Sequence, residues 1–172
     1  MIVIVCGVSG CGKTTTGKLL AERLGLNFYD ADDFHTQSNI EKMSNGLPLT
    51  DDDRRPWLET LATNLSDWQS QGGAVLACSA LKESYRKPLN DCCEDVRWVT
   101  LRVPEGLLAE RVSTREHFFD QRLLQSQLEI FEIPYYGCVV NAFGTPSEVV
   151  DNIILQLGIE TNKIDSERLL DA

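Results

Sequence analysis

The sequence has no excess of basic residues. It contains 16 lysine and arginine residues against 26 aspartate and glutamate residues, which gives a formal net charge of −10. Because binding to a nucleic-acid backbone or to an anionic membrane needs a positive field, we expect neither as a partner. An anionic ligand would have to be held by a few local cations. The candidates are Lys13, Arg54, Lys82, Arg111 and Arg115.

Long hydrophobic runs and metal-binding cysteine patterns are also missing. No apolar stretch approaches the roughly 20 residues that a membrane span requires. The first expected strand begins at residue 2, so we expect no targeting segment. The six cysteines do not have the spacing of metal ligands, which indicates reduced thiols. These absences together predict a cytoplasmic protein.

An alternation of strand and helix patterns is present along most of the chain. The 172 residues, 42% of them hydrophobic, suit one globular domain over residues 1–172. The expected strands are 2–6, 27–30, 74–79, 96–103 and 138–142. The expected helices are 13–24, 56–71, 82–89, 104–115, 120–132 and 146–157. This order predicts an α/β fold with a parallel sheet covered by helices on both faces, followed by a polar tail over 158–172.

The segment from Gly7 to Thr14 fits the phosphate-binding pattern G-x-x-x-x-G-K-[ST]. It follows the first strand and opens the first helix, so that backbone N–H groups and the helix N-terminus face the same anion. We expect Lys13 to reach the outer phosphates of a nucleotide and the Thr14 hydroxyl to coordinate Mg²⁺. The candidate nucleotide-binding residues are Gly7, Val8, Ser9, Gly10, Cys11, Gly12, Lys13, Thr14 and Thr15.

Three acids, Asp30, Asp32 and Asp33, lie where the second expected strand ends. In an extended chain Asp30 and Asp32 share a face, at the sheet edge to which the first strand delivers the phosphate loop. A carboxylate there can orient an acceptor hydroxyl, take its proton or hold the shell of Mg²⁺. We assign Asp32 to the acceptor, with helix capping by Asp32 or Asp33 as the alternative. Which of Asp30 and Asp32 contacts the metal stays open.

A second acid group lies at 51–53. Thr50 and Asp53 fit a capping box, whereas Pro56 disfavours helical geometry at Arg55, so the helix proper is expected from about residue 56. Arg54 is the residue that we select here, as a clamp for a substrate carboxylate or hydroxyl.

Basic residues also follow the third expected strand and lie in the last turns of the expected helix 104–115. Lys82 and Arg86 lie one helical turn apart, and Arg86 suits either the cleft or a solvated helix face. Arg111 and Arg115 share a helix face and could swing over phosphates, which predicts a mobile lid over about 111–132. Surface pairing with Glu110 or Glu116 is the alternative for this arginine pair.

Taken together, these motifs resemble one family, the gluconokinases, which are small P-loop carbohydrate kinases. The most specific block is Gly46-Leu-Pro-Leu-Thr-Asp-Asp-Asp-Arg-Arg-Pro-Trp-Leu58. The other matching blocks, spread over roughly 2–157, are 7–14, 29–35, 39–43, 77–82, 85–86, 117–119 and 123–127. One departure lies in the lid, where Glu116 precedes His117 and the family usually has glycine.

The resemblance implies a P-loop NTPase of the nucleoside-monophosphate-kinase-like class, with five parallel strands in the order 2-3-1-4-5 and a mobile lid. It implies transfer from ATP, with Mg²⁺, to the 6-hydroxyl of D-gluconate, and it suggests a homodimer. The implied catalytic residues are Lys13, Asp32, Arg111 and Arg115. The implied substrate contacts are Asp32, His35, Arg54, Lys82 and His117, although His117 could instead pack on its phenylalanine neighbours.

Two other functions share some of these motifs. A shikimate-type kinase would need the same phosphate loop and an acid after the second strand, and only the block at 46–58 speaks against it. A nucleotide-binding regulatory module is the second alternative, since Asn162-Lys-Ile-Asp165 spells a guanine-reading tetrapeptide. That tetrapeptide follows the last helix and not a strand, which indicates a coincidence.

Overall fold

The computed structural model describes residues 1–113 and 121–159. The first half of the fold comprises β1 (Ile2–Cys6), α1 (Lys13–Leu24), β2 (Asn27–Asp30), the short 3-10 helix η1 (Ala31–Phe34), α2 (Gln37–Ser44) and α3 (Asp51–Ser70). The second half comprises β3 (Ala74–Cys78), α4 (Glu83–Asp91), β4 (Val96–Arg102), α5 (Glu105–Ser113), α6 (Gln121–Ile130), β5 (Cys138–Asn141) and α7 (Pro146–Leu157). None of the helices in these ranges has the length and apolar character needed to cross a membrane.

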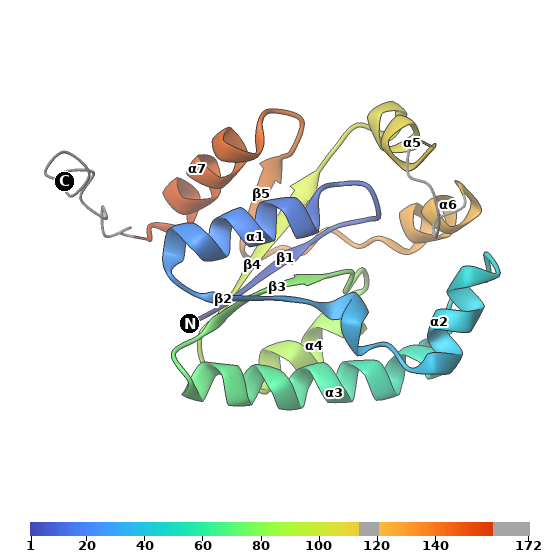
Figure 1. Ribbon diagram of the computed structural model, residues 1–172, viewed down its shortest axis with the longest axis horizontal. Helices are drawn as coiled ribbons and strands as arrows, with labels where there is room; N and C mark the ends of the chain where they lie inside the picture. The colour runs from blue at the N-terminus through green and yellow to red at the C-terminus, as the bar shows by residue number, and fades with distance from the viewer. Residues whose placement is uncertain (114–120, 160–172) are drawn as a thin grey trace, which may run out of the picture.

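The five strands form one parallel sheet in the order β2-β3-β1-β4-β5, which confirms the expected fold class and strand order (Figure 1). In the centre of the sheet, Ile4 of β1 pairs with Leu76 on one side and Trp98 on the other. Parallel strands need crossover connections, so the helices that link them cover both faces.

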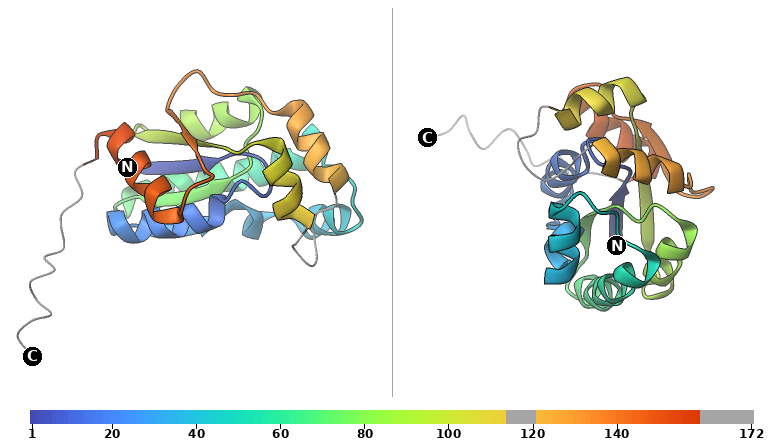
Figure 2. Two further views of the ribbon diagram at one scale, coloured as in Figure 1. Left: turned by 90° about the horizontal axis from the view of Figure 1, so that it is seen from above. Right: turned by 90° about the vertical axis from the view of Figure 1, so that its right-hand side faces the viewer.

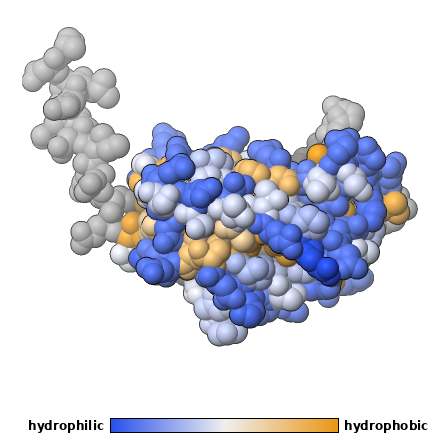
Figure 3. Space-filling model, turned by 90° about the horizontal axis from the view of Figure 1, so that it is seen from below, coloured by the Kyte–Doolittle hydropathy of each residue, from blue (hydrophilic) through white to orange (hydrophobic). Residues whose placement is uncertain are grey.

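Alternate side chains of each strand enter two separate hydrophobic cores. Val3 and Val5 of β1 point into the core beneath α1 and α7. Ile2 and Ile4 point into the opposite core, against α3 and α4. The two helical layers are visible above and below the sheet (Figures 1 and 2), and the outer surface seen from below is largely hydrophilic with a hydrophobic strip (Figure 3).

The start of α3 differs from the expectation. The helix begins at Asp51 and continues through Pro56, whereas the sequence predicted a start near residue 56. Pro56 lacks only one N–H bond, near the solvent-exposed end of the helix. The capping box between Thr50 and Asp53 is complete, and the buried Trp57 anchors the same helix, so these two contributions outweigh the missing bond.

Helix α2 and the turn η1 were not predicted. Their sequences carry no hydrophobic periodicity. In the structure, Asn39 is the one buried residue of α2. Instead, the Thr36 side chain caps α2, and the Asn39 Nδ2 atom donates to the Asp53 carbonyl over 2.8 Å. Polar contacts to α3 therefore stabilise α2. The other boundaries that fall in the described ranges agree with the expectations within two residues.

We predict that Thr50→Ala lowers the free energy of unfolding by about 1 kcal/mol, because the first turn of α3 loses its capping box. Thr63→Ala is the matched control, since Thr63 is exposed in the middle of the same helix. Its hydroxyl donates to the backbone carbonyl of Glu59, one turn earlier in the helix. Urea unfolding should show a change below about 0.5 kcal/mol for the control. Equal losses in both variants would contradict this account of the helix start.

Candidate active site

The phosphate loop connects the C-terminal end of β1 to the N-terminus of α1. Gly12 is the N-cap of α1 with a φ of 100°, and no side chain caps the helix. The first-turn N–H groups are therefore directed at the loop, where the helix dipole favours an anion. The Lys13 ammonium donates to the Val8 carbonyl over 3.2 Å and thus lies across the loop.

The loop is tied to β2 by one hydrogen bond between side chains. The Thr14 hydroxyl donates to Asp30 Oδ2 over 2.7 Å, and Asp30 Oδ1 accepts from the Asp32 backbone N–H over 3.2 Å. Asp30, and not Asp32 or Asp33, is therefore the residue that caps η1. Thr14 and Asp30 together present hard oxygen atoms of the kind that Mg²⁺ prefers, so the residues fit a magnesium site.

Asp32 projects from η1 into a small cavity of about 30 Å³ beside Lys13. Its side chain is 60% exposed, and the packing of the protein around it removes part of its hydration. This desolvation raises the pKa of Asp32, the charge of Lys13 opposes the rise, and the charges of Asp30 and Asp33 add to it. A carboxyl group with a raised pKa is a better proton acceptor than an ordinary aspartate.

His35 forms part of the wall of the same cavity. Its ring stacks on Trp57 with a centroid separation of 4.6 Å, and its side chain is 4% exposed. Burial, and secondarily the charge of Arg54, lower the pKa of His35 to about 4. The Nδ1 atom accepts from Asn39 Nδ2 over 3.4 Å, so the proton of the neutral ring lies on Nε2, 3.9 Å from Asp32 Oδ1.

The predicted cations divide between the cavity and its surroundings. Arg54 lines the cavity, donates to the Leu49 carbonyl and lies over the Tyr85 ring, with 5.3 Å between Cζ and the ring centroid. Lys82 lies outside that lining, where its Nζ atom pairs with Asp51 over 2.9 Å. Lys82 also lies over the Tyr85 ring, with 5.2 Å between Nζ and the ring centroid, so Arg54 and Lys82 share Tyr85 as a neighbour.

Arg86 is buried and does not line the cavity, which decides the question that the sequence left open. Its side chain is 1% exposed, and its guanidinium donates to the carbonyl groups of Ala80 and Leu81 and to the Glu83 carboxylate. Arg86 thus holds the loop after β3 and is neither a cleft residue nor part of a solvated helix face.

A second pocket, of about 320 Å³, lies on the other side of the phosphate loop. Arg111 lines it and donates to the Ala142 carbonyl over 3.2 Å and to the Gly10 carbonyl over 3.5 Å. Thr15 and Thr16 of α1 and the segment that leads into α7 complete its walls. Residues of the phosphate loop thus line both the larger pocket and the smaller cavity.

The structure brings Lys13, Asp32, His35 and Arg54 together around the smaller cavity. Arg115 and His117 lie outside the described residues, as does the tetrapeptide at 162–165. Sequence reasoning missed several residues of the cavity wall. These are Met43, Leu49, Trp57, Ser79 and Gln127.

The signals that could have found these residues were weak. Met43 and Gln127 lie in blocks that carry the family resemblance, but nothing in those blocks indicated a role. Trp57 has helical spacing with the core residues of α3, and it is indeed buried. The stacking of His35 on the Trp57 ring shows that Trp57 also supports a residue of the site.

Within residues 1–113 and 121–159 no cluster of His, Cys, Asp and Glu is able to hold a metal by itself. All six cysteines are free. Burial raises the pKa of Cys11 in the phosphate loop and raises that of Cys6 to about 11, so neither thiol is a nucleophile at neutral pH.

We predict that His35 makes the protein less stable as the pH falls from about 6.5 towards 4. The unfolded chain binds a proton at His35 in this range and the folded chain does not, so the free energy of unfolding falls by about 2 kcal/mol between pH 7.5 and pH 5. Urea unfolding of the wild type and of His35→Gln isolates the contribution of His35 to this pH dependence, because glutamine does not bind a proton in this pH range. Parallel pH dependences of the two proteins would refute the lowered pKa.

Comparisons with known proteins identify relatives of this chain. A family model of the AAA domain matches residues 3–125. A probable gluconokinase of Dictyostelium discoideum is 40% identical over 168 residues, which cover 91% of this chain and 84% of the relative. The crystal structure of a gluconokinase from Sinorhizobium meliloti 1021 matches with a TM-score of 0.83 at 40% identity, covering 91% of this chain and 90% of that one.

A shikimate kinase from Aquifex aeolicus matches over 92% of this chain and 96% of its own, with a TM-score of 0.59 and 21% identity. This second likeness concerns the fold alone, because so low an identity leaves the acceptor site unspecified. The identities to gluconokinases, about 40%, extend over most of both chains. The chain therefore belongs to the gluconokinase family.

Proposed function

We propose that the protein transfers the γ-phosphoryl group of ATP to the 6-hydroxyl of D-gluconate, which yields 6-phospho-D-gluconate and ADP. The observation that carries this proposal is the position of the Asp32 carboxylate in one cavity with Lys13, His35 and Arg54, directly beside the phosphate loop. An anionic polyhydroxy acceptor needs a proton acceptor, a cation and neutral hydrogen-bond donors, and the residues around this cavity include all three.

The nucleotide would occupy the opposite side of the loop. Its phosphates would lie on residues 7–15 and Lys13, and its base and ribose would lie in the pocket of about 320 Å³ lined by Arg111. Thr14 would hold Mg²⁺ with Asp30 in the surrounding shell, since the two side chains are already hydrogen-bonded. When bound, the metal would neutralise charge on the phosphates.

The residues of the chain then divide the chemistry between them. Asp32 takes the proton of the 6-hydroxyl, which its raised pKa favours, and Lys13 holds the transferred group. His35 stays neutral and donates from Nε2, while Arg54 pairs with the acceptor carboxylate. We retain Lys82 and His117 as further acceptor contacts and Arg111 and Arg115 as cations that exclude water on closure.

Phosphorus NMR tests the proposed reaction directly. The protein with ATP and Mg²⁺ is incubated with gluconate or with shikimate, and the phosphate-ester signals are followed with time. We expect 6-phosphogluconate from gluconate and a much smaller kcat/KM for shikimate. A larger kcat/KM for shikimate, or release of inorganic phosphate alone with gluconate, would refute the proposal.

We predict that Asp32→Asn lowers kcat by a factor of about 100 or more, because the amide cannot accept the proton of the acceptor hydroxyl. ATP binding should remain nearly unchanged in calorimetry, since among the described residues the Asp32 carboxylate is coupled to the phosphate loop only through the charge of Lys13. Asp33→Asn is the matched control, because Asp33 is an exposed neighbour that does not line the cavity. Retained activity in Asp32→Asn would make Asp32 a structural residue only.

A further inference from the structure

Gln127 of α6 makes a direct contact with the phosphate loop. The Ser9 backbone N–H donates to Gln127 Oε1 over 2.7 Å, although the two residues are 118 positions apart in the chain. Gln127 also lines the small cavity that holds Lys13 and Asp32. One side chain therefore contacts both the loop that would bind phosphate and the cavity that would bind the acceptor.

The chemistry of the amide determines which way Gln127 faces. A backbone N–H can only donate, so the atom on Ser9 must be the carbonyl oxygen Oε1 and the amide cannot be turned around. The Nε2 atom, with two N–H donors, occupies the other branch of the amide. In the part of the chain that the structure describes, no protein hydrogen bond uses Nε2, which leaves both donors for a ligand.

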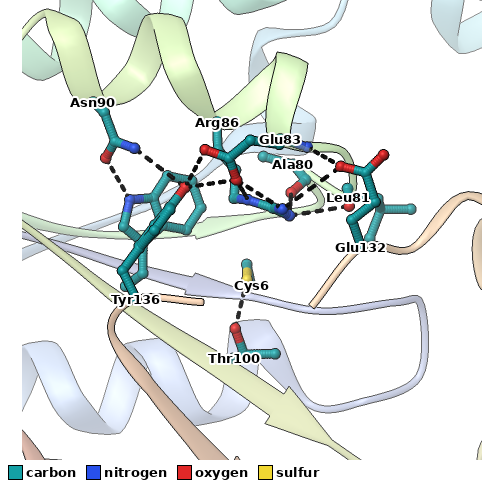
Figure 4. A network of polar contacts seen from close by, with 10 residues as sticks. Cys6, Ala80, Leu81, Glu83, Arg86, Asn90, Thr100, Glu132 and Tyr136 are labelled. Atoms are coloured by element: carbon teal, nitrogen blue, oxygen red, sulfur yellow. Dashed lines mark hydrogen bonds and ion pairs between the residues drawn. The ribbon is translucent and has the colours of Figure 1, made fainter. Parts of the chain in front are cut away.

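The position of α6 is set by a network just beyond its end (Figure 4). The Glu132 N–H donates to the Leu81 carbonyl over 2.9 Å, and the Glu132 carboxylate accepts from the Glu83 N–H over 2.5 Å. The buried Arg86 lies 3.9 Å from the same carboxylate and donates to the Leu81 carbonyl. These contacts join the end of α6 to the loop after β3.

The first turn of α6 is anchored by packing. Leu123 and Leu124 are 4% and 5% exposed, and Leu124 belongs to the core beneath α1 and α7. The helix is therefore held by polar contacts at its end and by apolar contacts at its start. A side chain so placed is preorganised towards its ligand, which reduces the entropy lost on binding.

We propose that Gln127 is a specificity-determining contact of the acceptor, and this inference rests on the proposed function. Its Nε2 atom donates to a hydroxyl oxygen of the polyhydroxy acid, while Oε1 stays on the Ser9 N–H. Arg54 supplies the charge for the carboxylate, so a neutral donor suits the hydroxyl chain. Occupation of the acceptor cavity thereby stabilises one conformation of the phosphate loop.

Gln127→Met tests the inference, because methionine has a similar length and cannot form either hydrogen bond. We expect KM for gluconate to rise about tenfold, as for the loss of a hydrogen bond in a desolvated site. KM for ATP should change less than twofold, because Gln127 contacts only one N–H of the loop. Gln125→Met is the matched control, since Gln125 is exposed on the same helix and bonds only Glu129.

Two further measurements keep the test decisive. Gln127→Asn retains the amide but is one methylene shorter, so it should raise KM for gluconate as well. A thermal shift with Mg²⁺ and ADP, equal to that of the wild type, shows that each variant keeps a folded nucleotide site. An unchanged KM for gluconate, or a rise confined to KM for ATP, would overturn the inference.

Failure of the proposed function gives a different result. If the wild type and Gln125→Met both fail to phosphorylate gluconate, the proposed reaction is refuted and this inference is refuted with it. If both turn over gluconate and only the Gln127 variants keep an unchanged KM, the reaction stands and the role of Gln127 is refuted.

Discussion

The parallel arrangement of the five strands is the constraint on which the rest of the structure depends. Because every strand runs the same way, the residues that follow β1, β2 and β3 meet at one edge of the sheet (Figure 1). The phosphate loop, the acids of β2 and Ser79 are thus neighbours in space although they are far apart in the chain. The helices α2, α5 and α6 lie around the same edge (Figure 2).

Local electrostatics allow an acidic protein to present a site for anions. The sequence has a net charge of −10, yet Lys13 and Arg54 line the same cavity. Two residues beside these cations, Asp32 and His35, have shifted pKa values, and desolvation is the main cause of both shifts. Limited hydration raises the pKa of Asp32 and lowers that of His35, so each is displaced towards its uncharged form.

Polar contacts, those of Arg86 fully buried, hold together the segments that carry the site. Arg86 holds the loop after β3, and Glu132 joins that loop to the end of α6 (Figure 4). Asn39 joins α2 to the start of α3 in the same way. Because a buried polar group without a partner is costly, such contacts specify one arrangement of segments that hydrophobic packing alone would leave loose.

The sequence by itself determined the phosphate loop, the strand and helix alternation and the candidate cations, because each depends on residues close together in the chain. The strand order followed from the family resemblance. The tertiary structure alone decided that Arg86 is buried, that Lys82 pairs with Asp51 and that Gln127 reaches Ser9. The same held for α2, whose stability comes from contacts with α3. The partners of Lys82, Gln127 and Asn39 are distant in the chain, and the site of Arg86 is completed by the distant Glu132, so no local pattern encodes these features.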